Sequence, residues 1–163
     1  MNSTPWLQHV SPKLAANGFQ PLPPEVYQPL SYKYAVRRSR FEITKFGMAE
    51  SFFMFAEIPD LRADVMQSFS ATSFGLANQN KVTPLPNGLF ACVFCYAVAM
   101  TERLDPAVAA HIKTTAPVKH WASNEIPVVF DLASGELCYF EGTPVWGAAY
   151  YAGFRREIES NLR

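Results

Sequence analysis

Charged residues are scarce in this sequence. Asp, Glu, Lys and Arg make up 17% of the 163 residues, and they balance to a formal net charge of zero. Non-specific binding to nucleic acids or anionic membranes is driven by excess positive charge, so this balance argues against both. No apolar run approaches the length of about 18 residues that would cross a bilayer, so we expect no membrane-spanning segment.

Cysteines are also few, with three in the chain. Cys92 and Cys95 have the C-x-x-C spacing, but no second pair completes a zinc site, and Cys138 stands alone. The stretch MNSTPWLQHV lacks the basic region and apolar core of a secretory signal. We therefore expect three buried free thiols, no metal, and a protein of the reducing cytoplasm.

The eight glycines are scattered, and they form none of the glycine-rich loops that bind dinucleotides or phosphates, nor the G-x-S-x-G of many hydrolases. We therefore expect no cofactor. What the chain does have is apolar residues (49%) and aromatic rings (14%), enough for one compact domain. So many rings on a lightly charged protein also favour docking against a second copy or a partner.

The chain divides at about residue 30. Residues 1–30 carry two helix starts, Thr4-Pro5 and Ser11-Pro12, and then a stretch with four prolines, QPLPPEVYQPL. We expect two short helical turns followed by an extended arm. Residues 31–163 are expected to form the core domain.

Alternating and 3.6-residue periodicities in the core domain predict the element order β-β-α-β-α-β-β-α. The expected strands cover 32–46, 51–58, 89–100, 126–132 and 136–141, and the expected helices 61–73, 106–116 and 144–161. Such mixed hairpins and helices predict an α+β fold, a single domain with one mostly antiparallel sheet covered by helices.

The segment APVKHWASNEIPVVFDL, residues 116–132, holds the most interesting candidate site. His120 is expected in a loop, where functional residues gather, and a histidine can act as a general base if a carboxylate orients its ring. Glu125 or Asp131 could supply that carboxylate, so these three are the candidate catalytic residues. The alternative is a loop histidine that caps the backbone or stacks on Trp121.

Three arginines, Arg37, Arg38 and Arg40, lie among aromatic residues of the first strand, a pattern that can grip a nucleic-acid backbone. The zero net charge argues against nucleic-acid binding by these arginines, and salt bridges along an edge strand are the alternative interpretation. Trp121, Trp146, Arg38 and Arg40 are nevertheless the candidate binding residues, Trp146 lying on the last helix at the edge of a possible dimer contact.

The leading hypothesis is a non-enzymatic binding domain that acts through self-association, as a homodimer, or through a protein partner. A small enzyme or ligand-binding domain with a pocket near His120, Trp121 and Asp131 is the alternative. Contact with nucleic acid through the arginines is a weaker one.

Overall fold

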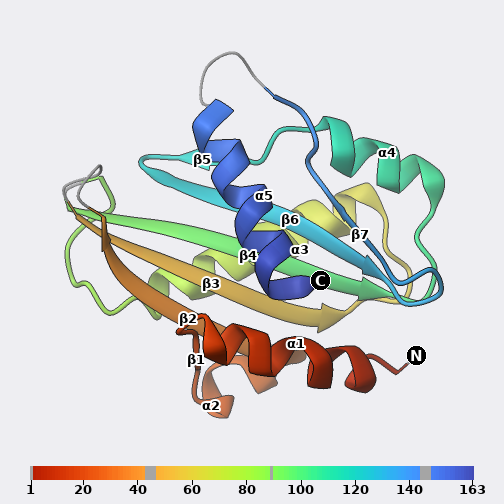
Figure 1. Cartoon of the computed structure of the whole chain (residues 1–163), viewed down its shortest axis with the longest axis horizontal. Helices are drawn as coiled ribbons and strands as arrows, with labels where there is room; N and C mark the ends of the chain where they lie inside the picture. The colour runs from red at the N-terminus through yellow and green to blue at the C-terminus, as the bar shows by residue number, and fades with distance from the viewer. Residues whose placement is uncertain (1, 43–46, 89, 144–147) are drawn as a thin grey trace.

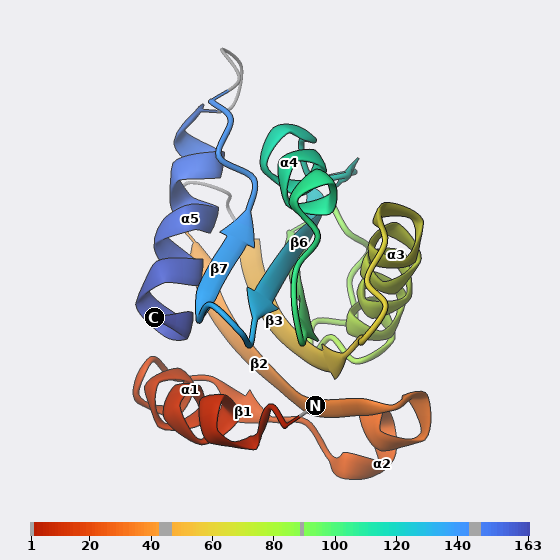
Figure 2. The same cartoon turned by 90° about the vertical axis from the view of Figure 1, so that its right-hand side faces the viewer.

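The computed structural model describes residues 2–42, 47–88, 90–143 and 148–163, which form a central sheet with helices on both faces (Figures 1 and 2). In chain order the elements are α1 (Thr4–Ala16), β1 (Gln20–Pro21), α2 (Pro24–Tyr27), the 3-10 turn η1 (Gln28–Leu30), β2 (Tyr32–Glu42), β3 (Gly47–Glu57), α3 (Ala63–Gln79), β4 (Ala91–Thr101), α4 (Pro106–Thr114), β5 (Lys119–His120), β6 (Ser123–Asp131), β7 (Glu136–Tyr139) and α5 (Ala148–Leu162). The single-domain α+β fold predicted from the sequence is confirmed.

The sheet is mixed, and it differs from the mostly antiparallel sheet predicted because its two central strand pairs are parallel. Its seven strands run in the order β1-β2-β3-β4-β6-β5, with β7 pairing β6. The β1-β2, β2-β3, β5-β6 and β6-β7 pairs are antiparallel, but the central β3-β4 and β4-β6 pairs are parallel. The cause is that α3 and α4 each cross over between two neighbouring strands, and such a connection returns the chain in the same direction.

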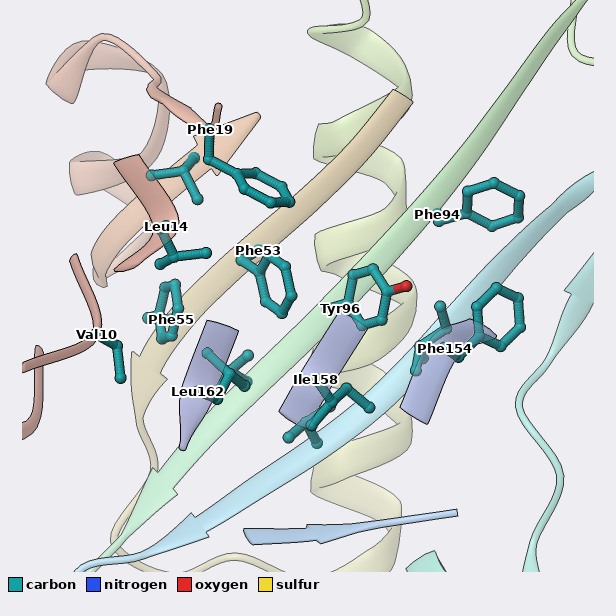
Figure 3. Packing of buried hydrophobic residues seen from close by; sticks show 14 of the residues in the cluster. Val10, Leu14, Phe19, Phe53, Phe55, Phe94, Tyr96, Phe154, Ile158 and Leu162 are labelled. Atoms are coloured by element: carbon teal, nitrogen blue, oxygen red, sulfur yellow. The ribbon is translucent and has the colours of Figure 1, made fainter. Parts of the chain in front are cut away.

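The central strands are apolar on both faces because helices cover both faces. Every residue of β4 is buried. Toward α1 and α5, alternate residues of β3 and β4 pack with both helices (Figure 3). That cluster includes Val10, Leu14, Phe19, Phe53, Phe55, Phe94, Tyr96, Phe154, Ile158 and Leu162.

The opposite face of the sheet packs against α3 and α4, and α2 covers it beside β2. The apolar residues there form two further clusters, centred on Phe52 and Met54 and on Ala97 and Val129. A bulge between Tyr32 and Tyr34 reverses the parity of β2, so that these two rings point to opposite faces. From Tyr34 to Glu42 the pairing with β3 continues without a further shift.

The N-terminal segment departs from its predicted form. Residues Thr4–Ala16 are one helix with Pro12 inside it, where two short turns are expected. The proline-rich stretch pairs with β2 through Gln20 and Pro21 and then forms the short turns α2 and η1, so it is not an extended arm. Pro24 and Pro29 lie in the first two positions of these turns, where a backbone amide has no partner within the turn.

Several local predictions are confirmed. Asp105 caps α4, accepting from the backbone of Ala107 at 2.8 Å, and β6 and β7 form the expected hairpin. The helix predicted from residue 61 begins at Ala63, and the strand predicted from residue 126 begins at Ser123. The predicted start of the last helix at Pro144, and with it Trp146, lies outside the described residues.

Cys92, Cys95 and Cys138 are free and buried, as the sequence predicts. Cys92 and Cys95 lie on opposite faces of β4, and burial raises the pKa of the Cys95 thiol far above its ordinary value. None of the helices within the described ranges is both long enough and apolar enough to cross a membrane.

Candidate functional site

A hollow of about 520 Å³ opens at the end of the sheet where the parallel strands begin. The hollow is lined by the first residues of β3, β4 and β6, by β5 and the turn after it, and by the first turn of α5. These segments lie at the same end of the molecule (Figure 1). The described lining residues are Gly47, Met48, Gly88, Phe90, Ala91, Cys92, Lys119, His120, Trp121, Ala122, Asn124, Tyr150 and Tyr151.

A small β-hairpin carries the polar side of this hollow. Lys119 and His120 of β5 pair with Asn124 and Ser123 of β6, and Trp121 and Ala122 connect them, with Ala122 in the left-handed region at φ 55°. Because side chains alternate along a strand, residues directly opposite each other share a face. Lys119 and Asn124 therefore project to the face that bears α5, and His120 and Ser123 to the face that bears α3.

His120 is held on two sides. Its Nε2 atom lies 2.6 Å from Oε1 of Glu125, and its ring stacks on Phe74 of α3 at 4.2 Å between centroids. The Glu125 side chain is 7% exposed and that of His120 is 40% exposed. The structure thus brings together two of the three candidate catalytic residues and places His120 on the wall of the hollow.

Asp131 is not part of this site. It ends β6, about 26 Å along the strand from Ser123 at 3.3 Å per residue. Its carboxylate accepts hydrogen bonds from the backbone of Ala133 and Ser134 and shapes the β6-β7 turn. Partial burial raises the pKa of Asp131, but the hydrogen bonds from Ala133, Leu104 and Ser134 together outweigh it and leave the pKa below its ordinary value.

Aromatic rings are exposed around the hollow. Trp121 is 79% exposed, and Phe90 and Tyr150, which also line the hollow, are more than half exposed. The indole of Trp121 lies over Gly88, at the place where a Cβ atom would stand. Phe41 is exposed as well and lies across from Met48, another lining residue.

Asn124 is a buried amide in the wall of the hollow. The residue is 7% exposed, and within the described ranges its side chain makes no hydrogen bond. The ammonium group of its neighbour Lys119 likewise has no ion-pair or hydrogen-bond partner among the residues that the structure describes. Among the described residues, the sealed side-chain polar atom without a hydrogen-bond partner is Oγ of Ser70, so the amide of Asn124, which lines the hollow, is open to it and can bind a ligand there.

The far wall of the hollow is held by a network around Glu50. This carboxylate is 1% exposed and accepts hydrogen bonds from the backbone amides of Val82 and Thr83. Lys81 donates to the carbonyl of Leu85 and to the side chain of Asn87. The connection from α3 to Gly88 and Phe90 is therefore ordered by internal hydrogen bonds.

The arginines predicted as binding residues make contacts within the protein. Arg38 is largely buried, pairs with Glu157 of α5 at 2.6 Å and stacks its guanidinium on Phe19. Arg37 donates to the carbonyl of Asn80, and Arg40 to that of Asn17. These contacts favour a role in fastening helices to β2 over a role in gripping nucleic acid.

Within the described ranges, no three His, Cys, Asp or Glu side chains gather in a way that could hold a metal ion. Asn124, Lys119, Phe90 and Tyr150 are not among the site residues predicted from the sequence. No turn signal marks the hairpin that pairs Lys119 with Asn124, because the connecting residues Trp121 and Ala122 are not those that two-residue hairpin turns favour. Comparison of the chain with known protein families, with curated proteins and with solved structures finds no significant match.

Proposed function

We propose that this chain is a small-molecule-binding domain, whose ligand occupies the hollow at the start of the parallel strands. The observation that carries the proposal is the hollow itself, about 520 Å³, with exposed rings beside the polar side chains of Lys119, His120 and Asn124. Sites for small molecules in proteins have volumes of roughly 300 to 1,000 Å³, apolar walls and a few convergent polar groups. The lining residues have this composition.

Binding is a better account of the site than catalysis. Among the described residues that line the hollow, His120 can act as an acid or base, and the carboxylate of Glu125 orients its ring. Its recorded contacts are that carboxylate and the ring of Phe74, and neither is a nucleophile that His120 could activate. We assign His120 and Glu125 the task of fixing the wall of the hollow and presenting a polar edge to the ligand.

Protein-observed NMR with a library of small compounds of mixed charge tests the proposal. The indole N–H signal of Trp121, assigned by loss of that peak in Trp121→Phe, is the reporter. Binding compounds should shift this signal and the backbone signals of Asn124 and Phe90, and leave the indole of Trp6, packed on Phe130, unmoved. A library in which no compound shifts the Trp121 signal at millimolar concentration would contradict the proposal.

Self-association is a second candidate function, favoured by the four rings that are exposed at this end of the sheet. Phe41, Phe90, Trp121 and Tyr150 lie on or beside the hollow, and rings of this kind supply much of the contact area in protein interfaces. We propose a second copy of the chain as the occupant of this ring surface. Light scattering should then give a mass that rises toward twice 18.2 kDa at micromolar concentration, and Trp121→Ser should keep it monomeric.

We further infer that the protein works in the cytoplasm, because all three of its cysteines are unpaired. Fractionation of the native cells with detection of the chain would test this, and recovery from an oxidising compartment would contradict it.

A further inference from the structure

We infer that the hollow takes a flat aromatic carboxylate, with Lys119 and Asn124 binding the carboxylate group and the exposed rings covering the flat part of the molecule. This inference rests on the proposed function and names the class of ligand. It follows from the charge of the lining, from the position of the Asn124 amide beside Lys119 and from the arrangement of the rings.

The charge of the lining favours an anion. Lys119 is cationic, the carboxylate of Glu125 is engaged with His120, and the lining residues that the structure describes include no Asp or Glu. The nearest carboxylate along β2 is that of Glu42, which lies across from Gly47 and is engaged with other groups. Within the described lining, an anion therefore meets the ammonium group of Lys119, and a cation meets no carboxylate.

Lys119 and Asn124 are placed to act on one group. They lie directly opposite each other in the β5-β6 pair, so their Cβ atoms share a face and stand about 5 Å apart. Lys119 offers ammonium donors and Asn124 offers an amide N–H₂. From Cβ atoms this close, the flexible side chain of Lys119 can bring its ammonium group to the same carboxylate that the Asn124 amide contacts, and the hydrogen bond from the ammonium group is charge-assisted.

The rings favour a flat ligand. Trp121, Phe90 and Tyr150 enter the hollow from the β5-β6 turn, from the residue before β4 and from the first turn of α5. Each keeps at least half of its surface open, so their faces and edges are available to stack on another ring. A saturated ring cannot offer the flat π face that this contact needs.

A carboxylate fits better than a phosphate. A phosphate carries more charge and is held by arginine forks or by the amides of a glycine-rich loop. The described lining has neither, and its single lysine matches a single negative charge.

The experiment is a titration of the full chain, by calorimetry and by Trp121 N–H shifts, with four probes of similar size. The probes are 2-naphthoate, its neutral analogue 2-naphthamide, the cation 2-naphthylmethylammonium, and decahydro-2-naphthoate as an anion without an aromatic ring. We expect 2-naphthoate to bind at least tenfold more tightly than each of the other three.

Two variants and a control locate the effect. Lys119→Met and Asn124→Leu should each weaken 2-naphthoate by about tenfold and leave the weaker binding of 2-naphthamide within about twofold. The matched control is Lys113→Met, which removes a lysine that pairs with Glu141 away from the hollow, and it should bind 2-naphthoate as the unaltered chain does. Amide spectra of each variant establish that it is folded.

The outcomes separate the two claims. If 2-naphthamide or the cation binds as tightly as 2-naphthoate, or if Lys119→Met leaves 2-naphthoate unchanged, the hollow is a binding site but the assigned ligand class is wrong. If no probe and no library compound moves the Trp121 signal, the proposed function and this inference both fall.

Discussion

The Oε1 atom of Glu50, buried in β3, accepts a hydrogen bond of 2.7 Å from the backbone amide of Thr83, and its Oε2 atom accepts one of 2.8 Å from the amide of Val82. One carboxylate thus satisfies two amides of the connection that leads from α3 to the hollow. Hydrogen bonds to a charged acceptor are about twice as strong as neutral ones, which makes this contact a principal anchor of the far wall.

Glu50→Ala should therefore lower the free energy of unfolding by about 2 to 3 kcal/mol, since it leaves two amides without an acceptor. Urea denaturation measures the loss. The matched control is Glu102→Ala, an exposed residue in the connection after β4, where a change within about 0.5 kcal/mol is expected. Equal effects of the two substitutions would contradict the anchoring role of Glu50.

The pair His120–Glu125 should show a favourable coupling of about 1 kcal/mol in a double-mutant cycle with His120→Ala and Glu125→Ala. Burial of Glu125 strengthens the contact, and the partial exposure of His120 limits it. Arg62 and Asp64, an ion pair whose side chains are both mostly exposed, should give a smaller coupling in the same cycle. Additive effects of the two substitutions at His120 and Glu125 would show that the contact contributes nothing.

Gly88→Ala should destabilise the protein by about 1 to 2 kcal/mol and displace Trp121. Gly88 has a φ of +90°, a backbone conformation that residues with a side chain rarely adopt, and an added Cβ atom would clash with the indole ring of Trp121. Gly75→Ala in α3 is the matched control, because nothing lies near its added methyl group and alanine favours a helix. Stability by urea denaturation and the chemical shift of the Trp121 indole give the two measurements, and an unmoved indole would argue against the close approach.

Asn124→Leu should leave the stability of the ligand-free protein unchanged or raise it by about 1 kcal/mol. The residue is 7% exposed and its side chain makes no hydrogen bond in the described structure, so replacing it by an apolar group of similar size breaks no hydrogen bond within the protein. A residue kept for binding often costs stability in this way. A loss of more than about 1 kcal/mol on thermal or urea unfolding would indicate that Asn124 holds the fold.

Asp131 should stabilise the protein at neutral pH and stop doing so in acid. The pKa of its carboxyl group in the folded protein lies below the ordinary value of 3.8. Its charge therefore contributes stability that is present above this ordinary value and is lost as the pH falls through the folded pKa. Asp131→Asn keeps an acceptor for the turn, so its deficit against the unaltered chain should be visible at pH 7 and shrink at pH 3. A deficit that grows in acid would contradict the lowered pKa.

Local signals were sufficient for most elements of this fold. Asp105-Pro106 predicts the start of α4 because an aspartate cap and a proline at the first helical position act within one turn. The buried run from Ala91 predicts a central strand because it is apolar on both faces. Sheet direction depends on contacts between distant segments, but the two crossovers through α3 and α4 were a usable signal for parallel pairing.

The site was predicted only in part for the same reason. His120 and Glu125 are five residues apart, and their pairing follows from the local hairpin. Phe74, Phe90 and Tyr150 reach the site from α3, from the start of β4 and from α5, and no local pattern in the sequence relates them. Asp131 was predicted to lie in the pocket with His120, but it is the last residue of β6, and the hollow is at the opposite end of that strand.

Adjacent residues of β5 point to opposite faces, and this alternation joins two features that lie on different sides of the sheet. The bond between His120 and Glu125 restrains the rotation of this two-residue strand about its own axis. The direction of Lys119, one residue away, is set by that same restraint. The hydrogen bond that holds His120 thus also limits where the ammonium group of Lys119 can reach, although the two side chains leave the strand on opposite faces.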